Sequence, residues 1–182
     1  MRWALGVVVI GVLLAGVAGA QVTAGQLAAV LTPANLASLA HNPVARLEVA
    51  TAMAKAGWNG PQLGGQPHLF AGVSLAGSYR CRVTYFSPPH AQVGDWKPCT
   101  LGADAEGPVL TVPGLYAGHL LDGGPGQKVF YGVRLAEGSA VVPRYGLSPA
   151  RDVAGFFYAL GGGKYRLEIA AESGRFEVVE VE

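Results

Sequence analysis

The chain has 182 residues, which is enough for one domain with a substantial hydrophobic core. Its 13 basic and 12 acidic side chains give a formal net charge of +1, and charged residues are sparse throughout. Nucleic acids and anionic membrane surfaces select proteins with a basic surface. We therefore expect neither of them as the main partner.

Residues 1–20 have the pattern of a secretory signal peptide. Arg2 supplies a positive charge, residues 3–14 are apolar, and residues 18–20 (Ala-Gly-Ala) have the small-x-small form that signal peptidase cleaves. Cleavage would leave 12 basic side chains (13 minus Arg2) against 12 acidic ones. The pattern predicts a secreted, periplasmic or cell-envelope protein without membrane insertion. The alternative is that residues 1–20 remain attached as a membrane anchor.

Residues 21–57 carry helix signals. Thr23 and Gln26 fit a capping box, and Thr32-Pro33 places a cap residue before a proline at the first helical position. Asn42-Pro43 repeats that start signal, and Gly57 ends the last apolar stripe. We expect two or three short helices here. They contain no Asp, Glu, Lys or Arg before Arg46, so we expect them to pack on the main domain or on a partner.

Residues 58–182 have strand periodicity after a turn-rich linker, residues 57–67. Polar and apolar side chains alternate in residues 79–86 and again in residues 164–169. Further strand candidates are residues 109–112, 115–121, 128–135, 155–160 and 176–181, with a weaker one at 141–142. Glycine-rich turns separate them. The fold class is therefore mainly β (α+β), an antiparallel β-barrel-like domain of roughly seven to nine strands preceded by the helices.

Cys81 and Cys99 are the only cysteines, and an even number in an exported protein predicts a disulfide. A bond across a loop of this size contributes about 3 kcal/mol to stability. A redox role would favour a C-x-x-C spacing, which is absent. We expect a structural bond.

No motif for catalysis, metal binding or a cofactor stands out. The four histidines are not at zinc-ligand spacing, and no serine lies in a G-x-S-x-G context. We expect no metal, no cofactor and no assigned catalytic residue. Asp104 and Glu106 resemble a solvated turn more than a carboxylate pair for glycoside hydrolysis.

The candidate ligand residues lie on the predicted strands. Arg80 and Arg82 share one strand face, which would bind an anion if it lined the barrel interior and would be surface charge if it faced solvent. His119 is a further candidate on a predicted strand, although the position is more typical of an ordinary core or surface histidine. The aromatic-rich strands add Tyr79, Tyr131 and Phe157. Residues 156–158 are apolar on both strand faces, so the outer face must be covered by the helices, a partner or a ligand.

The segment 75–82 (Leu-Ala-Gly-Ser-Tyr-Arg-Cys-Arg) resembles part of a known family when read with motifs further along the chain. Those motifs are Cys99, Gly118 after Tyr116, residues 129–132, 145–146, 151–155, and the closing 166–167 and 177–180. Their order is similar to that of an uncharacterised family of exported bacterial proteins, a domain of unknown function with a G-x-[WY]-x-C-R strand and paired cysteines. The resemblance covers roughly residues 58–182 and implies no known activity. This chain departs from it in a shortened turn at residues 122–126, which lacks a second basic residue.

A looser similarity is to lipocalin-type barrels. Gly77-Ser-Tyr79 resembles their G-x-W motif, and Arg175 resembles their closing arginine. In those barrels the arginine stacks on the aromatic ring and seals the barrel floor. This similarity concerns the fold alone.

Two functions are compatible with these observations. The first is a non-enzymatic binding or structural module of the envelope, holding a small apolar or amphipathic ligand inside the barrel or contacting an envelope protein. The alternative is a secreted hydrolase or modifying enzyme whose site draws on Arg80, Arg82, His119, Asp104 or Glu106, which requires these side chains to converge in one cleft. The sequence does not indicate an oligomeric state.

Overall fold

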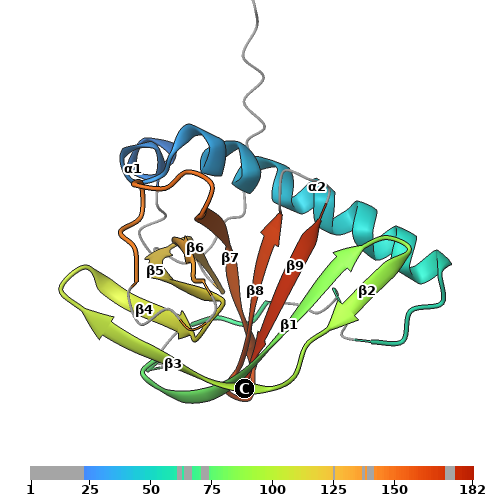
Figure 1. Ribbon diagram of the computed structural model, residues 1–182. Helices are drawn as coiled ribbons and strands as arrows, with labels where there is room; N and C mark the ends of the chain where they lie inside the picture. Colours follow the sequence, from blue (N-terminus) through green and yellow to red (C-terminus); the bar gives the residue numbers. More distant parts are fainter. Residues whose placement is uncertain are drawn as a thin grey trace, which may run out of the picture.

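The computed structural model describes residues 23–60, 63, 67–70, 74–124, 126–136, 138, 142–170 and 175–182. The predicted signal peptide, residues 1–20, lies outside them. Two helices precede nine strands along the chain (Figure 1). The helices are α1 (Ala24–Val30) and α2 (Pro33–Lys55), and the strands are β1 (Gly77–Ser87), β2 (His90–Val93), β3 (Lys97–Asp104), β4 (Gly107–Val112), β5 (Tyr116–Asp122), β6 (Gln127–Arg134), β7 (Asp152–Gly161), β8 (Lys164–Ala170) and β9 (Phe176–Val181).

The strands form one antiparallel sheet that closes on itself. The order is β2-β1-β3-β4-β5-β6-β7-β8-β9, and β9 also pairs with β1. Eight strands therefore form a barrel, and β2 is an extra strand that pairs with the C-terminal end of β1, residues 84–87. The predicted antiparallel barrel is confirmed. The β7–β8 turn uses three successive glycines, 161–163, with φ of 81°, 61° and 74°.

The barrel interior is filled by side chains. Alternate residues of the eight barrel strands point inward and form one buried cluster, which includes both cysteines. Its largest members are Tyr116, Phe130, Phe157, Tyr165, Leu101, Leu110, Leu167 and Ile169. The expected internal ligand would have to displace this core, so a site that needs no such rearrangement must lie outside the barrel.

The two helices begin at the predicted caps. Thr23 Oγ1 accepts a hydrogen bond from the Gln26 N–H at 3.2 Å, and Gln26 Oε1 accepts one from the Thr23 N–H at 2.8 Å. Thr32 caps α2 ahead of Pro33, and α2 ends before Gly57, whose φ is +72°. No helix among the described residues is both long and apolar enough to span a membrane.

The helix restart expected at Asn42-Pro43 is wrong. The helix α2 runs through Pro43 for 23 residues, instead of breaking into short pieces. Packing supplies the reason, because α2 lies across β7 and β8 and Asn42 Nδ2 donates to the Glu168 carbonyl oxygen at 3.1 Å. These contacts offset the hydrogen bond that a proline cannot donate.

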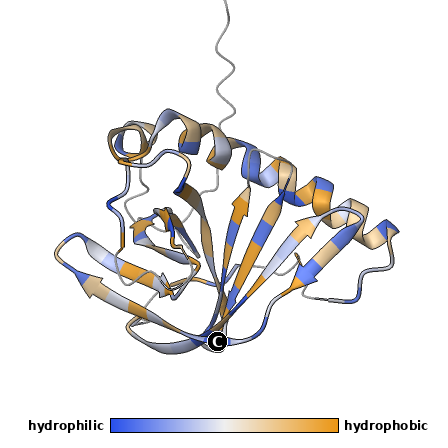
Figure 2. Cartoon of the chain, in the orientation of Figure 1, coloured by the Kyte–Doolittle hydropathy of each residue, from blue (hydrophilic) through white to orange (hydrophobic). Residues whose placement is uncertain are grey.

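The coverage of the outer barrel face by α2 explains why β7 and β8 are buried on both faces (Figure 2). The Phe157 ring points into the barrel, whereas Phe156 lies outside it and packs with Leu36 and Leu39. The protein's own helices therefore cover the second apolar face of residues 156–158.

Other expectations are confirmed or corrected locally. The Cys81–Cys99 disulfide is present between β1 and β3. The segment between the two cysteines, expected as a loop, contains the strand β2. Of the weak strand candidate at residues 141–142, Val142 is not in a strand and residue 141 lies outside the described residues. The lipocalin-type contact would place Arg175 on Tyr79. Here the guanidinium of Arg175 lies over the ring of Tyr85, 5.7 Å from its centroid, and Tyr79 packs on Tyr165.

Candidate functional site

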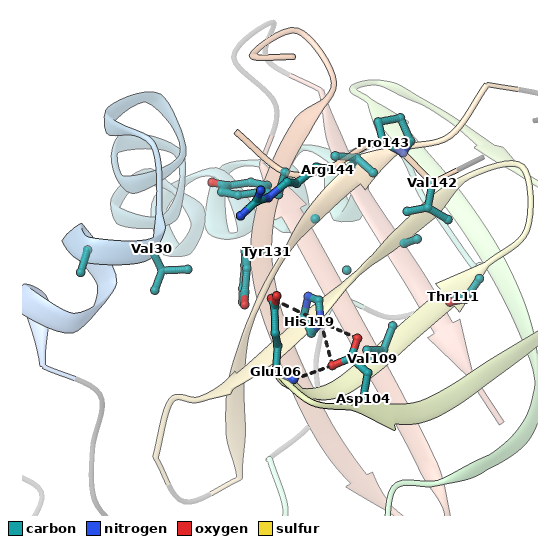
Figure 3. Close-up of a pocket in the computed structure, with 16 residues that line it drawn as sticks. Val30, Asp104, Glu106, Val109, Thr111, His119, Tyr131, Val142, Pro143 and Arg144 are labelled. Carbon is teal, nitrogen blue, oxygen red and sulfur yellow. Dashed lines mark hydrogen bonds and ion pairs between the residues drawn. The ribbon is translucent and has the colours of Figure 1, made fainter. Parts of the chain in front are cut away.

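A cavity of about 690 Å³ lies against the outside of the barrel wall, which we call the outer pocket. Its floor is the outer face of β4, β5 and β6, and its sides are α1 and residues 142–145 (Figure 3). Its volume is within the range of small-ligand sites. The lining residues are Ala29, Val30, Asp104, Glu106, Val109, Thr111, Ala117, Gly118, His119, Tyr131, Gly132, Val133, Val142, Pro143, Arg144 and Tyr145.

A histidine and two carboxylates meet at one end of the outer pocket. The strand register places His119 of β5 beside Val109 of β4. Asp104 ends β3 and Glu106 lies in the following turn, so the β3–β4 hairpin brings both carboxylates next to the imidazole. The Nε2 atom of His119 is 3.0 Å from Asp104 Oδ2 and 3.8 Å from Glu106 Oε2.

The hairpin turn holds Asp104 in its charged form. The backbone N–H of Glu106 donates to Asp104 Oδ1 at 2.8 Å. That hydrogen bond, followed by the one from His119, lowers the pKa of Asp104 below its usual value. Asp104 is therefore a carboxylate at neutral pH, and it orients the imidazole through Nε2.

Two tyrosine rings form a corner beside the imidazole. Tyr131, paired with His119 across β5 and β6, stacks on the imidazole with centroids 5.5 Å apart. Tyr145 meets Tyr131 edge to face at 5.4 Å. Burial, followed by the charges of Glu106 and Asp104, raises the pKa of Tyr131. The Tyr131 hydroxyl therefore keeps its proton at neutral pH and remains a hydrogen-bond donor.

The wall that carries Tyr145 is attached to the rest of the fold at two points. The Tyr145 hydroxyl oxygen accepts hydrogen bonds from the Thr32 N–H at 3.2 Å and from Asn35 Nδ2 at 2.7 Å, at the start of α2. The Gly146 N–H donates to the Asp152 carboxylate at 3.1 Å. Because these hydrogen bonds fix both Tyr145 and Gly146, this side of the outer pocket is preformed.

The remaining candidate residues lie elsewhere. Arg80 and Arg82 are on the outer face of β1, where they pair with Glu182 and Glu180 at 2.8 Å and 2.7 Å. Both guanidinium groups also lie over the Trp96 ring. They are surface charges and do not reach the outer pocket.

Tyr79 and Phe157 also lie away from the outer pocket. Both pack against Tyr165, in or beside the barrel core. Of the candidate ligand residues, His119 and Tyr131 come together, and Asp104 and Glu106 join them. The convergence required for an enzyme site is therefore met in part.

A buried polar cluster inside the barrel was not expected. Arg134 donates to both carboxylate oxygens of Glu177 at 2.8 Å, and the Tyr116 hydroxyl donates to Glu177 Oε2. These residues come from β6, β9 and β5, and no local pattern links them. The guanidinium and the hydroxyl together satisfy the buried carboxylate, which is a structural role.

Compared with protein-family models, curated proteins and solved structures, the chain matches none. The similarity to exported bacterial proteins is therefore still a prediction. In the part of the chain that the structure describes, no group of three or more His, Cys, Asp and Glu side chains is arranged to hold a metal ion. The function must be inferred from the site itself.

Proposed function

We propose that this protein is an exported, non-enzymatic binding module that holds a small amphipathic ligand in the outer pocket. The observation that carries this proposal is the combination of a preformed cavity of about 690 Å³ with an oriented polar group, the His119–Asp104 pair at 3.0 Å. The remaining lining is largely apolar, with Val30, Val109 and Val142 among it. Small-ligand sites in proteins share this composition of apolar walls and a few fixed polar groups.

A fragment screen followed by ¹⁵N–¹H NMR tests the binding site. We expect binding fragments to shift the amide signals of residues 104–109, 119 and 131. Replacing Val109 with Trp places an indole ring on the floor of the outer pocket beside the acids and should reduce or abolish these shifts. Val93→Trp is the matched control, because Val93 is an exposed strand valine on β2, away from the outer pocket. A screen in which no fragment binds, or in which Val109→Trp binds as well as Val93→Trp, contradicts the proposal.

Export is the second part of the proposal, and it depends on residues 1–20. The Cys81–Cys99 bond supports it, because disulfides persist in oxidising compartments. The mass of the protein recovered from the periplasm of an expressing bacterium tests it. We expect a chain that starts at Gln21. Recovery of the uncleaved chain in the membrane fraction would support the anchor alternative.

A second candidate function is hydrolysis with His119 as general base, which the Asp104 contact favours because a carboxylate orients catalytic imidazoles. The attacking group would be water, since the lining residues include one aliphatic hydroxyl, Thr111, and no serine or cysteine. Turnover of bound ligands by the wild type, lost in His119→Gln while binding persists, would establish this function. Unchanged ligands after long incubation would reject it.

A further inference from the structure

We infer that the ligand of the outer pocket is a small organic cation, an ammonium or guanidinium group attached to an apolar body. This inference rests on the proposed function and specifies its ligand. The relevant observation is how the polar groups lining the cavity are already used, because a group without a partner in the protein is available to a ligand.

The carboxylates exceed the donors available to them. One ring nitrogen of His119 faces both acids, and it lies within hydrogen-bond distance of Asp104 alone. Asp104 also receives the Glu106 N–H. The Glu106 carboxylate, 3.8 Å from the imidazole, accepts no hydrogen bond from any described residue, and its side chain is 70% exposed. Glu106 therefore offers two acceptor oxygens and a negative charge.

The basic side chain of the outer pocket does not neutralise these acids. Arg144 is the one Lys or Arg among the lining residues, and it is on the wall formed by residues 142–145. No ion pair joins it to Asp104 or Glu106 in the described structure. In Figure 3 the Glu106 side chain extends from the hairpin towards His119, and Arg144 lies on the other side of Tyr131.

The rest of the cavity accepts an apolar body. Val109 lies beside the acids on the floor, and Val30 and Val142 face the space from α1 and the opposite segment (Figure 3). Val30 and Val142 are 38% and 55% exposed, which is unusual for valine. A ligand with a cationic end at Glu106 and an apolar end between these valines would cover both the charge and the apolar surface.

Isothermal titration calorimetry of three probes of similar shape and different charge tests the inference: 2-phenylethylammonium, 3-phenylpropanoate and 2-phenylethanol. We expect the ammonium to bind at least about tenfold more tightly than the other two, a difference of about 1.4 kcal/mol. Glu106→Gln should remove this preference and leave the affinity for 2-phenylethanol unchanged. Added salt should weaken the preference too, because exposed charges are screened.

The matched control is Glu48→Gln, which removes the same charge from the exposed side of α2. It should keep the preference for the ammonium. If the carboxylate binds as tightly as the ammonium, or if Glu106→Gln retains the preference, the ligand is not a cation, while the outer pocket remains a binding site. If none of the three probes binds, the cation inference is rejected, and the fragment screen decides the proposed function separately.

Discussion

The Arg166 guanidinium and the Glu168 carboxylate form an ion pair in which Nε and Oε1 are 2.8 Å apart, with side-chain exposures of 3% and 0%. Both project from the outer face of β8 and are covered by α2. From α2, Arg46 Nη1 approaches Glu168 Oε2 to 3.9 Å. Burial raises the pKa of Glu168 despite these cations, so desolvation outweighs the attraction.

Removing one partner of this pair should therefore destabilise the protein more than removing both. Arg166→Met leaves the buried Glu168 carboxylate with the more distant Arg46 as a cation, and Glu168→Leu takes from the Arg166 guanidinium the carboxylate at 2.8 Å. Each change alone should lower the free energy of unfolding by about 3–5 kcal/mol. The double variant should be close to wild type or more stable. Urea unfolding of the three variants measures this. Single variants that cost no more than the double variant would show that the pair is not desolvated.

The buried Tyr158 hydroxyl should make the protein less stable at alkaline pH. Burial, followed by the charge of Glu168, raises the pKa of Tyr158 to about 12 from its ordinary value of 10.0. Between these two values the unfolded chain loses the proton and the folded chain keeps it, so stability falls as pH rises from 10 towards 12. The Tyr158 share of this loss is at most about 3 kcal/mol.

The matched variant for this effect is Tyr158→Phe. Because Phe cannot ionise, its stability should fall less over the same pH range, as followed by chemical denaturation. Other buried tyrosines, such as Tyr116, contribute equally to both proteins and cancel in the comparison. Parallel pH curves for the two proteins would contradict the assignment.

The Cys81–Cys99 bond should contribute substantially to stability. It joins β1 to β3. Closing this loop lowers the conformational entropy of the unfolded chain and so raises the free energy of unfolding by about 3 kcal/mol. In a domain of this size, the Cys81→Ala/Cys99→Ala variant should melt about 6–12 °C below the oxidised wild type. Reductant should lower the melting temperature of the wild type only. Equal melting temperatures for oxidised and reduced protein would rule out a stabilising bond.

Gly118 should not tolerate a side chain. It faces Gly132 across β5 and β6, and a Cβ at Gly118 would overlap the Tyr131 carbonyl oxygen and the Gly132 Cα. Gly118→Ala should therefore cost about 1–3 kcal/mol. Gly102 on β3 is the control, because a Cβ there meets nothing within 4 Å. Differential scanning calorimetry should show a large loss for Gly118→Ala and almost none for Gly102→Ala; equal losses would contradict the close approach.

Strand periodicity was sufficient to predict the barrel. The alternation in residues 164–169 identifies β8, because Tyr165, Leu167 and Ile169 fill the interior. It did not predict that Arg166 and Glu168 are also buried, since this depends on α2 packing over the sheet. The same packing carries α2 through Pro43, where local rules predict a restart. Tertiary contacts override local signals in both cases.

The outer pocket was harder to predict than the fold. The sequence predicts a solvated turn for Asp104 and Glu106, which their exposure supports, and it offers His119 as a ligand candidate without linking it to these acids. Their proximity depends on the register between β4 and β5, which pairs Val109 with His119. Strand register is a non-local property, and no residue pattern within either segment encodes it. The wall formed by Tyr145 likewise depends on its contact with the start of α2.

The closure of the sheet affects how quickly this protein can fold. The barrel closes where β1 pairs with β9, a seam in which Cys81 lies opposite Val181. The first barrel strand can therefore complete its pairing only after the last strand has formed. Contacts so distant in sequence carry a large loop-closure entropy, which places such topologies among slowly folding proteins. Until the seam forms, β1 and β9 each present an unpaired edge that can pair with other chains. We therefore expect a chaperone that shields strand edges to increase the yield of folded protein.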